Sequence, residues 1–201
     1  MAELADRIAT CRLCADRFAA TATAHQPRPV LWHGTTARLL IAGQAPGLRV
    51  HGSGKPFTDP SGQRLRAWLG LTADQFYDRS RVAILPMAFC FPGYDARGAD
   101  LPPPLICAAT WRAAVLAQHN QVQLVLAVGA AAIRWHLGDR RAVTDAVAGW
   151  PAALERGICP LPHPSWRNTG WIKRNPWFEA ELLPVLRARI QTLMETPHDP
   201  A

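Results

Sequence analysis

Four short apolar runs recur along the chain, and each is followed by a loop rich in Gly or Pro or by the pattern of a helix. The runs cover residues 38–43, 81–85, 123–128 and 157–161. Apolar runs of this length, bounded by Gly and Pro, are typical of buried strands. Strands that alternate with helices form a parallel sheet covered by helices on both faces. The sequence therefore predicts an α/β fold, a small four-stranded parallel sheet in a three-layer α/β/α arrangement.

Helices are expected where apolar residues recur three or four positions apart, with capping residues and Gly or Pro marking most of their ends. Residues 18–29 lack such a period and are expected to form an irregular connection. Residues 139–156 are ambiguous, and one more helix and a turn are their expected content. The other helices are expected over residues 2–14, from 59 or 61 to 70, from 72 onward, after the prolines at 102–104, over 129–138 and over 177–195.

The length and composition describe one globular domain. The chain has 201 residues, of which 49% are hydrophobic and 18% charged, which predicts a single domain spanning residues 1–201. It has no run of about 18 apolar residues that could cross a bilayer. Its first residues include acids and lack a long apolar core, unlike a signal peptide. We expect a cytoplasmic protein with no membrane contact, and a monomer.

Five cysteines in such a chain favour metal or cluster ligation over disulfides, because cytosolic thiols are kept reduced. Cys11 and Cys14 are three residues apart, and Cys90 and Cys107 flank a loop rich in Pro and Gly. Four thiolates hold either zinc or an iron–sulfur cluster, and their spacing does not separate the two. The alternative is that two of them are buried apolar residues. Cys159 lies within the fourth apolar run and is expected in the core.

The loop after the first strand is dense in functional groups. Its glycines allow a ligand to approach the backbone closely. In an open parallel sheet such loops lie along one edge, so residues 44–60, 86–104 and 162–175 should converge there. The side chains of this first loop that could bind or react are Gln44, His51, Lys55, Phe57 and Asp59.

The loop after the fourth strand carries a second set of such groups. Prolines on both sides of His163 restrict the backbone and would hold its imidazole in one orientation, as a hydrogen-bond donor requires. Cations and tryptophans alternate after it, and the net charge of +7 comes mostly from arginine, which suits phosphate contacts. This composition is typical of a surface that holds a nucleic-acid strand. Its residues are Trp166, Arg167, Trp171, Lys173, Arg174 and Trp177.

Taken together, these motifs resemble the uracil-DNA glycosylase superfamily, closest to its iron–sulfur-containing bacterial and archaeal branch. The resemblance rests on GQAPG from Gly43, then G-x-P-F and Ser-Gly, on VGAAAIRWHLG from Val128, on the HPS sequence at His163, and on the cysteines. It implies hydrolysis of the N-glycosidic bond of deoxyuridine in single- or double-stranded DNA. It also implies a structural [4Fe–4S] cluster, whose ligands would be Cys11, Cys14, Cys90 and Cys107.

The resemblance also implies roles for individual residues. Phe57 would stack on the flipped uracil, and Gln44 and Ala45 would border the base and the attacking water. His163 would donate to uracil O2, with Ser165 beside it in the base-binding loop. Trp166 and Arg167 would fill the space that the base leaves. Lys173 and Arg174 are expected to bind DNA because they belong to the basic and aromatic stretch described above. Because no lysine stands out as a Schiff-base nucleophile, the expected product is an abasic site in an uncut strand.

The chain departs from the superfamily's pattern at two positions. The first motif commonly carries an acid, where this chain has Gln44 and Ala45. An Asn commonly follows the second strand, where this chain has Leu-Pro-Met-Ala at residues 85–88. His51 and Asp59 are the candidates for activating water in place of the acid, although Asp59 is equally suited to cap the next helix. A non-catalytic module that binds damaged or abasic DNA is therefore the alternative function.

Overall fold

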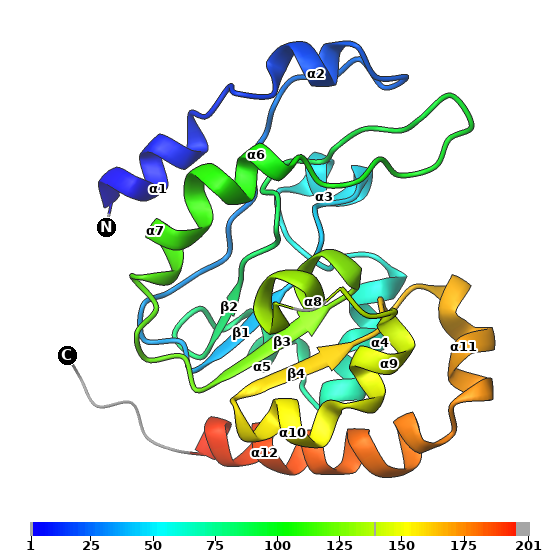
Figure 1. The fold of residues 1–201 in the computed structure, drawn as a ribbon. Helices are drawn as coiled ribbons and strands as arrows, with labels where there is room; N and C mark the ends of the chain where they lie inside the picture. Colours follow the sequence, from blue (N-terminus) through cyan, green and yellow to red (C-terminus); the bar gives the residue numbers. More distant parts are fainter. Residues whose placement is uncertain (1, 139, 196–201) are drawn as a thin grey trace.

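The four expected strands form one parallel sheet. The structure, a computed structural model, describes residues 2–138 and 140–195. The sheet has the order β2-β1-β3-β4, and every neighbouring pair is parallel. Figure 1 shows the strands side by side with helices around them. The predicted α/β fold with a four-stranded parallel sheet is confirmed. The strands are β1 (Leu39–Ala42), β2 (Val82–Ile84), β3 (Leu124–Val128) and β4 (Ile158–Leu161).

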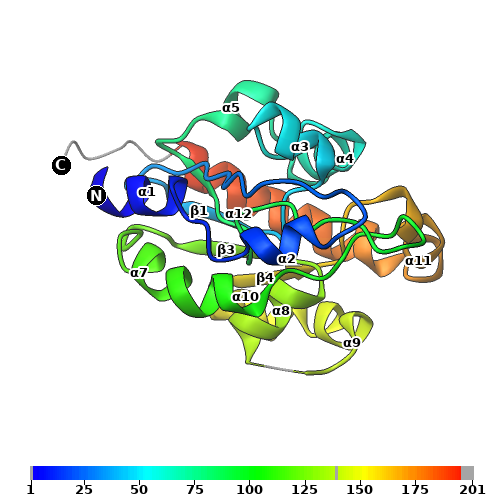
Figure 2. The same cartoon turned by 90° about the horizontal axis from the view of Figure 1, so that it is seen from above.

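Helices cover both faces of the sheet. Figure 2 shows α3, α4 and α5 on one side and α7, α8, α9 and α10 on the other. Short 3-10 or π segments, labelled η, continue or precede several of them. The bounds are α1 (Ala2–Ala9), α2 (Ala15–Ala19), α3 (Leu48–Ser53), α4 (Pro60–Leu69), α5 (Ala73–Tyr77), α6 (Leu105–Cys107), η1 (Ala108–Arg112), α7 (Ala113–Leu116), α8 (Ala130–Leu137), α9 (Val143–Ala148), α10 (Trp150–Glu155), η2 (Trp166–Asn168), α11 (Thr169–Arg174), η3 (Phe178–Leu182) and α12 (Leu183–Glu195).

The two faces of β1 pack into two apolar clusters. Leu39 and Ile41 belong to the larger cluster, together with Leu65 of α4. Leu40, which points to the opposite face, belongs to the second cluster with Trp111 of η1. Successive side chains of a strand alternate between faces, so a fully apolar strand needs a cover on each side. This double cover explains why the central strands contain no polar residue.

Several segments differ from the prediction. The first helix ends at Ala9 rather than near Cys14, because the Cys11 amide donates to the Ile8 carbonyl at 3.0 Å in a tighter final turn. Two short helices, α2 and α3, occupy segments expected to lack regular structure, and η2 and α11 lie within the loop expected over residues 162–175. Residues 143–155 form two helices, not one. The final helical region, η3 with α12, was predicted correctly.

A buried cation, Arg112, ties η1 to the end of β2. Its side chain is 2% exposed, and its Nη1 donates to the Leu85 and Pro86 carbonyl oxygens at 3.1 Å each. Its Nη2 lies 2.6 Å from Nε2 of His136 in α8, a contact in which the neutral imidazole accepts. Burial, reinforced by the neighbouring guanidinium, lowers the pKa of His136 to about 4. The folded protein therefore holds His136 neutral where the unfolded chain would protonate it.

We expect this histidine to make stability depend on pH. Between pH 6.5 and about 4 the unfolded state binds a proton at His136 that the folded state does not, so stability falls as the pH drops through this window. Urea unfolding should show a loss of about 2 kcal/mol from this residue between pH 7 and pH 5. The variant His136→Gln retains an acceptor for Arg112 but cannot bind the proton. Its stability should therefore fall less than that of the wild type between pH 7 and pH 5. An equal loss in both proteins would contradict the assignment to His136.

Among the helices that the structure describes, none is both long and apolar enough to cross a bilayer.

Candidate active site

One cleft of about 930 Å³ lies at the carboxyl ends of the strands. The loops after β1, β2 and β4 all line it, as the parallel topology predicts. A volume of this size suits a small ligand or a single extruded nucleotide. Of the residues predicted to catalyse or to bind substrate and DNA, those that line the cleft are Gln44, Ala45, Phe57, Asp59, His163, Ser165, Trp166 and Arg167.

Phe57 is held in an unusual backbone conformation at the cleft. Its φ is +54°, a left-handed value that costs energy for a residue with a side chain. The Tyr77 hydroxyl donates to the Phe57 carbonyl oxygen at 3.0 Å, and Arg66 Nη1 donates to the same oxygen at 3.2 Å. The tip of the Phe57 ring lies beside Gly43, where a Cβ would meet the ring at 3.6 Å, an ordinary van der Waals contact. These contacts fix an aromatic face next to the end of β1.

The helix that follows Phe57 begins against its carbonyl group. Asp59 is the N-cap of α4, and its Oδ1 accepts from the Gly62 amide at 3.0 Å. A Cβ at Gly62 would lie 1.8 Å from the Phe57 carbonyl oxygen, so only Gly fits there. Asp59 is therefore a helix cap, and it also lines the cleft. Its second carboxylate oxygen makes no hydrogen bond to the residues that the structure describes.

Two side chains hold the loop that carries His163. Asn168 Nδ2 donates to the His163 carbonyl oxygen at 2.7 Å. Arg64 of α4 donates from Nη1 to the Ser165 carbonyl oxygen at 3.0 Å and to the Thr169 hydroxyl at 3.2 Å. Both Arg64 and Asn168 line the cleft themselves. The imidazole of His163 is thus presented on a loop fixed from two sides.

The electrostatics of the cleft favour a neutral His163. Burial lowers the pKa of His163, and the negative charges of Asp59 and Asp100 oppose this shift without reversing it. A neutral imidazole carries one N–H donor and one acceptor. At neutral pH His163 can therefore donate a hydrogen bond to an acceptor atom in the cleft without carrying a charge.

Gln44 presents a free amide to the same cleft. Its side chain packs against Gly129, which begins α8 with a φ of +82°, and a Cβ there would approach the Gln44 Nε2 to 3.2 Å. Among the residues that the structure describes, none hydrogen-bonds to this side-chain amide, and Gln44 lines the cleft. An amide offers both donors and an acceptor. Gln44 can therefore bind a polar ligand edge.

The loop after β2 contributes backbone and apolar surface to the cleft. The Met87 and Ala88 amides donate to the Gly43 and Gln44 carbonyl oxygens at 2.9 and 3.0 Å, which extends the pairing of the two strands. Pro86 lines the cleft, and residues 85–88 carry no side-chain amide. Any side-chain amide that reads a polar ligand edge must therefore come from another segment.

Some predicted residues lie elsewhere. His51 does not line the cleft: its ring lies edge-on to His25 at a centroid distance of 5.1 Å and tilted to Phe91 at 6.0 Å. Lys173 and Arg174 are exposed in the last turn of α11 and do not line it either. The structure brings none of these three to Gln44, Phe57 and His163.

The tryptophans of the last loop also separate into two kinds. Trp166 is 75% exposed at the cleft, as a DNA-contacting residue requires. Trp171 instead donates to the Thr144 hydroxyl at 2.7 Å and packs against Trp177 and Phe178. Trp171 and Trp177 are thus partly buried against the core, whereas Trp166 is open to a ligand in the cleft.

Residues missed by sequence reasoning complete the cleft. Arg64, Tyr94, Asp100 and Asn168 line it. Tyr94 and Asp100 belong to the loop after β2, whose convergence on this edge was expected from topology alone. Arg64 lies on the amphipathic helix α4, and no sequence signal separates it from the other exposed arginines.

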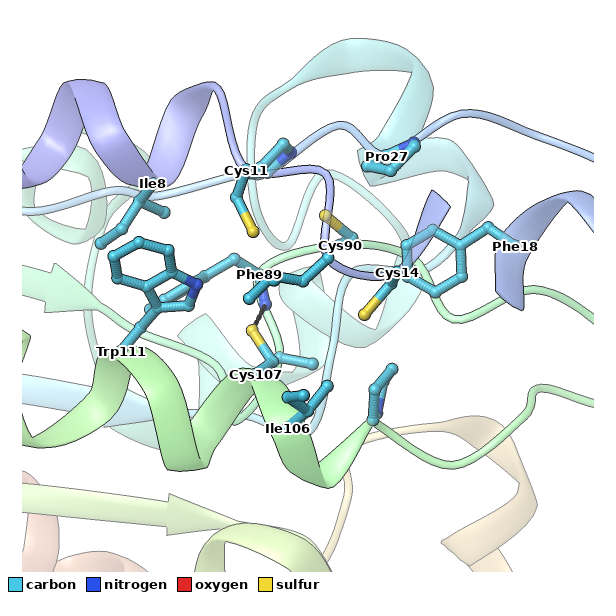
Figure 3. A pocket seen from close by; sticks show the side chains of 14 residues that line it. Ile8, Cys11, Cys14, Phe18, Pro27, Phe89, Cys90, Ile106, Cys107 and Trp111 are labelled. Carbon is cyan, nitrogen blue, oxygen red and sulfur yellow. Dashed lines mark hydrogen bonds between the residues drawn. The ribbon is translucent and has the colours of Figure 1, made fainter. Parts of the chain in front are cut away.

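The four predicted ligand cysteines meet in a separate, apolar pocket. Figure 3 shows Cys11, Cys14, Cys90 and Cys107 around one space, walled by Ile8, Phe18, Phe89, Ile106 and Trp111. The Phe89 amide donates to the Cys107 Sγ at 3.4 Å. Burial and the nearby thiols raise the pKa of Cys90 to about 12 and that of Cys107 to about 11. Cys159 is buried in β4, as predicted.

The positions of these four thiols limit which metal ion or cluster they could bind. Within residues 2–138 and 140–195, no three Cys, His, Asp or Glu side chains are placed to share one metal ion. A four-iron cluster takes one thiolate on each iron, so its ligands surround a group larger than an ion. A donor set of four thiols with an N–H···S contact from Phe89 is that of a thiolate site for a metal ion or a cluster.

One family model matches this chain. It is described as the uracil DNA glycosylase superfamily, and the match covers residues 31–187. The matched region includes the loops after β1, β2 and β4 that line the cleft.

Proposed function

The chain belongs to the uracil DNA glycosylase superfamily, and we propose that it releases uracil from DNA by hydrolysing the N-glycosidic bond, leaving an abasic site in an uncut strand. One observation carries this proposal. An aromatic face at Phe57, a free amide at Gln44 and a neutral imidazole at His163 line the same cleft. We propose that the protein acts as a monomer on uracil in single- or double-stranded DNA.

Each of these groups has a part in recognising an extruded base. A base must leave the helical stack before an enzyme can reach its glycosidic bond, and it then stacks on aromatic side chains while its polar edge is read by hydrogen bonds. Phe57 supplies the stacking face, and the Gln44 amide supplies donor and acceptor atoms for the edge. Trp166, exposed at the rim beside Arg167, fills the space that the base leaves in the DNA.

His163 acts on the leaving group. When the bond between C1′ and N1 breaks, negative charge develops on the uracil ring. A fixed donor aimed at that charge lowers the barrier, because it strengthens as the charge grows. The neutral form of His163 supplies such a donor for uracil O2. Asn168 and Arg64 keep the loop in place, so little reorganisation is needed at the moment of reaction.

An alkali-cleavage assay tests this proposal. The protein is incubated with single- and double-stranded oligonucleotides that carry one uracil, hypoxanthine, xanthine or mismatched thymine, and the strand is then treated with alkali. We expect the strand to be cut at the uracil position, and to be cut there only after the alkali treatment, because hydrolysis leaves an abasic site in an intact strand. Strands that stay intact with every base would refute glycosylase activity. Cleavage before alkali would refute the monofunctional reaction.

A non-catalytic module that binds damaged DNA remains the second candidate. It is favoured by the absence of a carboxylate at Gln44 and Ala45 and of a side-chain amide at residues 85–88. Such a protein would bind uracil-containing or abasic DNA with an affinity that falls as salt rises, because phosphate contacts release counterions. Salt-sensitive binding without base release is the result that would select it.

We also propose that the cysteine pocket holds a [4Fe–4S] cluster with a structural role. Cys11, Cys14, Cys90 and Cys107 would be its ligands, and the bound cluster would cross-link the N-terminal segment to the loop after β2 and to α6. The raised pKa values of the thiols mean that ionising them inside this pocket is costly unless a cation compensates for the charge. The Phe89 amide would then donate to a cluster-bound thiolate.

Removing one ligand should release the iron. We expect purified protein to be brown, with about four irons per chain, and Cys107→Ser to lose most of the iron and of the visible absorption. Its melting temperature should also fall, because cluster binding contributes to folding. Cys159→Ala is the matched control, since that thiol lies in β4 outside the pocket, and it should retain the iron. A colourless protein that contains zinc would contradict the cluster.

A further inference from the structure

Two carboxylates line the cleft, and one of them is free. Hydrolysis at C1′ passes through a transition state with positive charge on the sugar, and a nearby carboxylate both stabilises that charge and orients the attacking water. The residues at the end of β1, Gln44 and Ala45, cannot supply one. Of the residues that line the cleft, only Asp59 and Asp100 carry a carboxylate.

Asp100 is held on a small hairpin formed by residues 93–101. The Asp95 amide donates to the Ala99 carbonyl oxygen at 2.9 Å, and the Leu101 amide donates to that of Gly93 at 3.0 Å. Tyr94 and Asp100 form an antiparallel bridge across it. The backbone at Asp100 is therefore fixed, although the residue itself is exposed.

The turn and the base of this hairpin are also fixed. At the turn, the Asp95 carboxylate accepts from the Arg97 amide at 2.8 Å and from the Ala99 amide at 2.9 Å. At the base, Gly93 has a φ of +94°, and a side chain there would collide with Thr21. The hairpin thus packs closely on the N-terminal segment, which limits how far Asp100 can move from the cleft.

The two carboxylates differ in the hydrogen bonds that they already accept. Asp59 accepts the Gly62 amide and is oriented by the start of α4. Among the residues that the structure describes, none donates a hydrogen bond to the carboxylate of Asp100. Both charges act on His163, so Asp100 lies within electrostatic reach of the imidazole. The Asp100 carboxylate thus lines the same cleft as His163 and has both oxygens available for water.

We propose that Asp100 is a catalytic residue that orients and deprotonates the attacking water, an inference that rests on the glycosylase function proposed above. The bond between C1′ and N1 breaks, and its electron pair goes to the uracil ring, where His163 stabilises the charge at O2. The water oxygen forms the new bond to C1′. The water proton passes to the Asp100 carboxylate and then to solvent, while the uracil anion takes up a proton after it leaves. The hairpin thereby supplies the acid that the first motif lacks.

Single-turnover kinetics on a uracil-containing single strand test this assignment. Asp100→Asn should lower the rate of base release by about 100-fold. Its affinity for a strand with a non-hydrolysable 2′-fluoro-deoxyuridine should stay within about twofold of that of the wild type, because the carboxylate acts on the water. Added formate should restore part of the rate of Asp100→Ala. Asp59→Asn should lose less than Asp100→Asn, and Asp74→Asn, an exposed acid of α5 outside the cleft, should match the wild type.

The outcomes separate this inference from the function it rests on. If the wild type releases uracil and Asp100→Asn stays within about threefold of it, Asp100 is not the catalytic acid and the glycosylase function stands. A larger loss in Asp59→Asn than in Asp100→Asn would move the role to Asp59. A wild type that releases no base would overturn both. Melting temperatures of the variants guard against a loss of fold, which an exposed residue such as Asp100 should not cause.

Discussion

Replacing His163 by Ala is expected to lower uracil release by about 100-fold, because removing one fixed donor to a developing anion commonly costs that much. The affinity for uracil-containing DNA should change far less, since the donor contributes most in the transition state. Single-turnover base release and DNA binding, measured on the same preparations, separate the two effects. An equal loss in binding and in rate would show that His163 holds the ground-state complex instead.

The variant His51→Gln is the control for His163→Ala. The sequence makes both histidines candidates, and the structure places the His51 ring against His25 and Phe91, outside the cleft. We therefore expect His51→Gln to release uracil within about threefold of the wild type. A loss in His51→Gln as large as that in His163→Ala would contradict this placement of the site.

Gly62→Ala is expected to produce the largest loss of stability, together with loss of activity. Its new methyl group would lie 1.8 Å from the Phe57 carbonyl oxygen, which the Tyr77 hydroxyl and Arg66 already hold in place. Relieving the collision must move either the start of α4 or the strained backbone at Phe57. Forced repacking of this kind costs about 1–3 kcal/mol. Urea unfolding measures the stability, and the alkali-cleavage assay measures the activity.

Gly52→Ala is the matched control for that substitution. Gly52 lies inside α3, and a Cβ there would meet nothing within 4 Å. Alanine at an unobstructed helical position stabilises a protein by about 0.5–1 kcal/mol. The two variants add the same methyl group and should move stability in opposite directions. If Gly62→Ala were as stable as the wild type, the close approach of α4 to Phe57 would not exist in solution.

Features set by short-range pattern were predictable from the sequence. The apolar runs at 38–43 and 123–128 are strands because both faces of the sheet are covered, and a parallel sheet brings its loops to one edge. Gln44, Phe57 and His163 follow strands along the chain, so their convergence in the cleft follows from topology. The capping roles of Asp59 and Thr72 could likewise be read from their local sequence.

Features set by contacts between distant segments could not be predicted. His51 turns away from the cleft because His25 and Phe91, far from it in sequence, offer an aromatic surface. Trp171 and Trp177 look like Trp166 in sequence, yet two are packed inward and one is exposed. Asp100 gains its place from the hydrogen bonds of a hairpin rather than from a motif. In each case the position of the side chain is decided by contacts with another segment, not by the local sequence around the residue.

Arg112 connects the helical segment that carries Cys107 to the wall of the cleft. It lies five residues after Cys107 in one continuous helical region, and its guanidinium holds the carbonyl groups of Leu85 and Pro86, the latter at the cleft wall. If the segment around Cys107 unravels, a buried cation loses its partners, and leaving such a charge unpaired costs several kcal/mol. We therefore expect a disturbance of the helical turn at Cys107 to be transmitted through Arg112 to the cleft wall at Pro86.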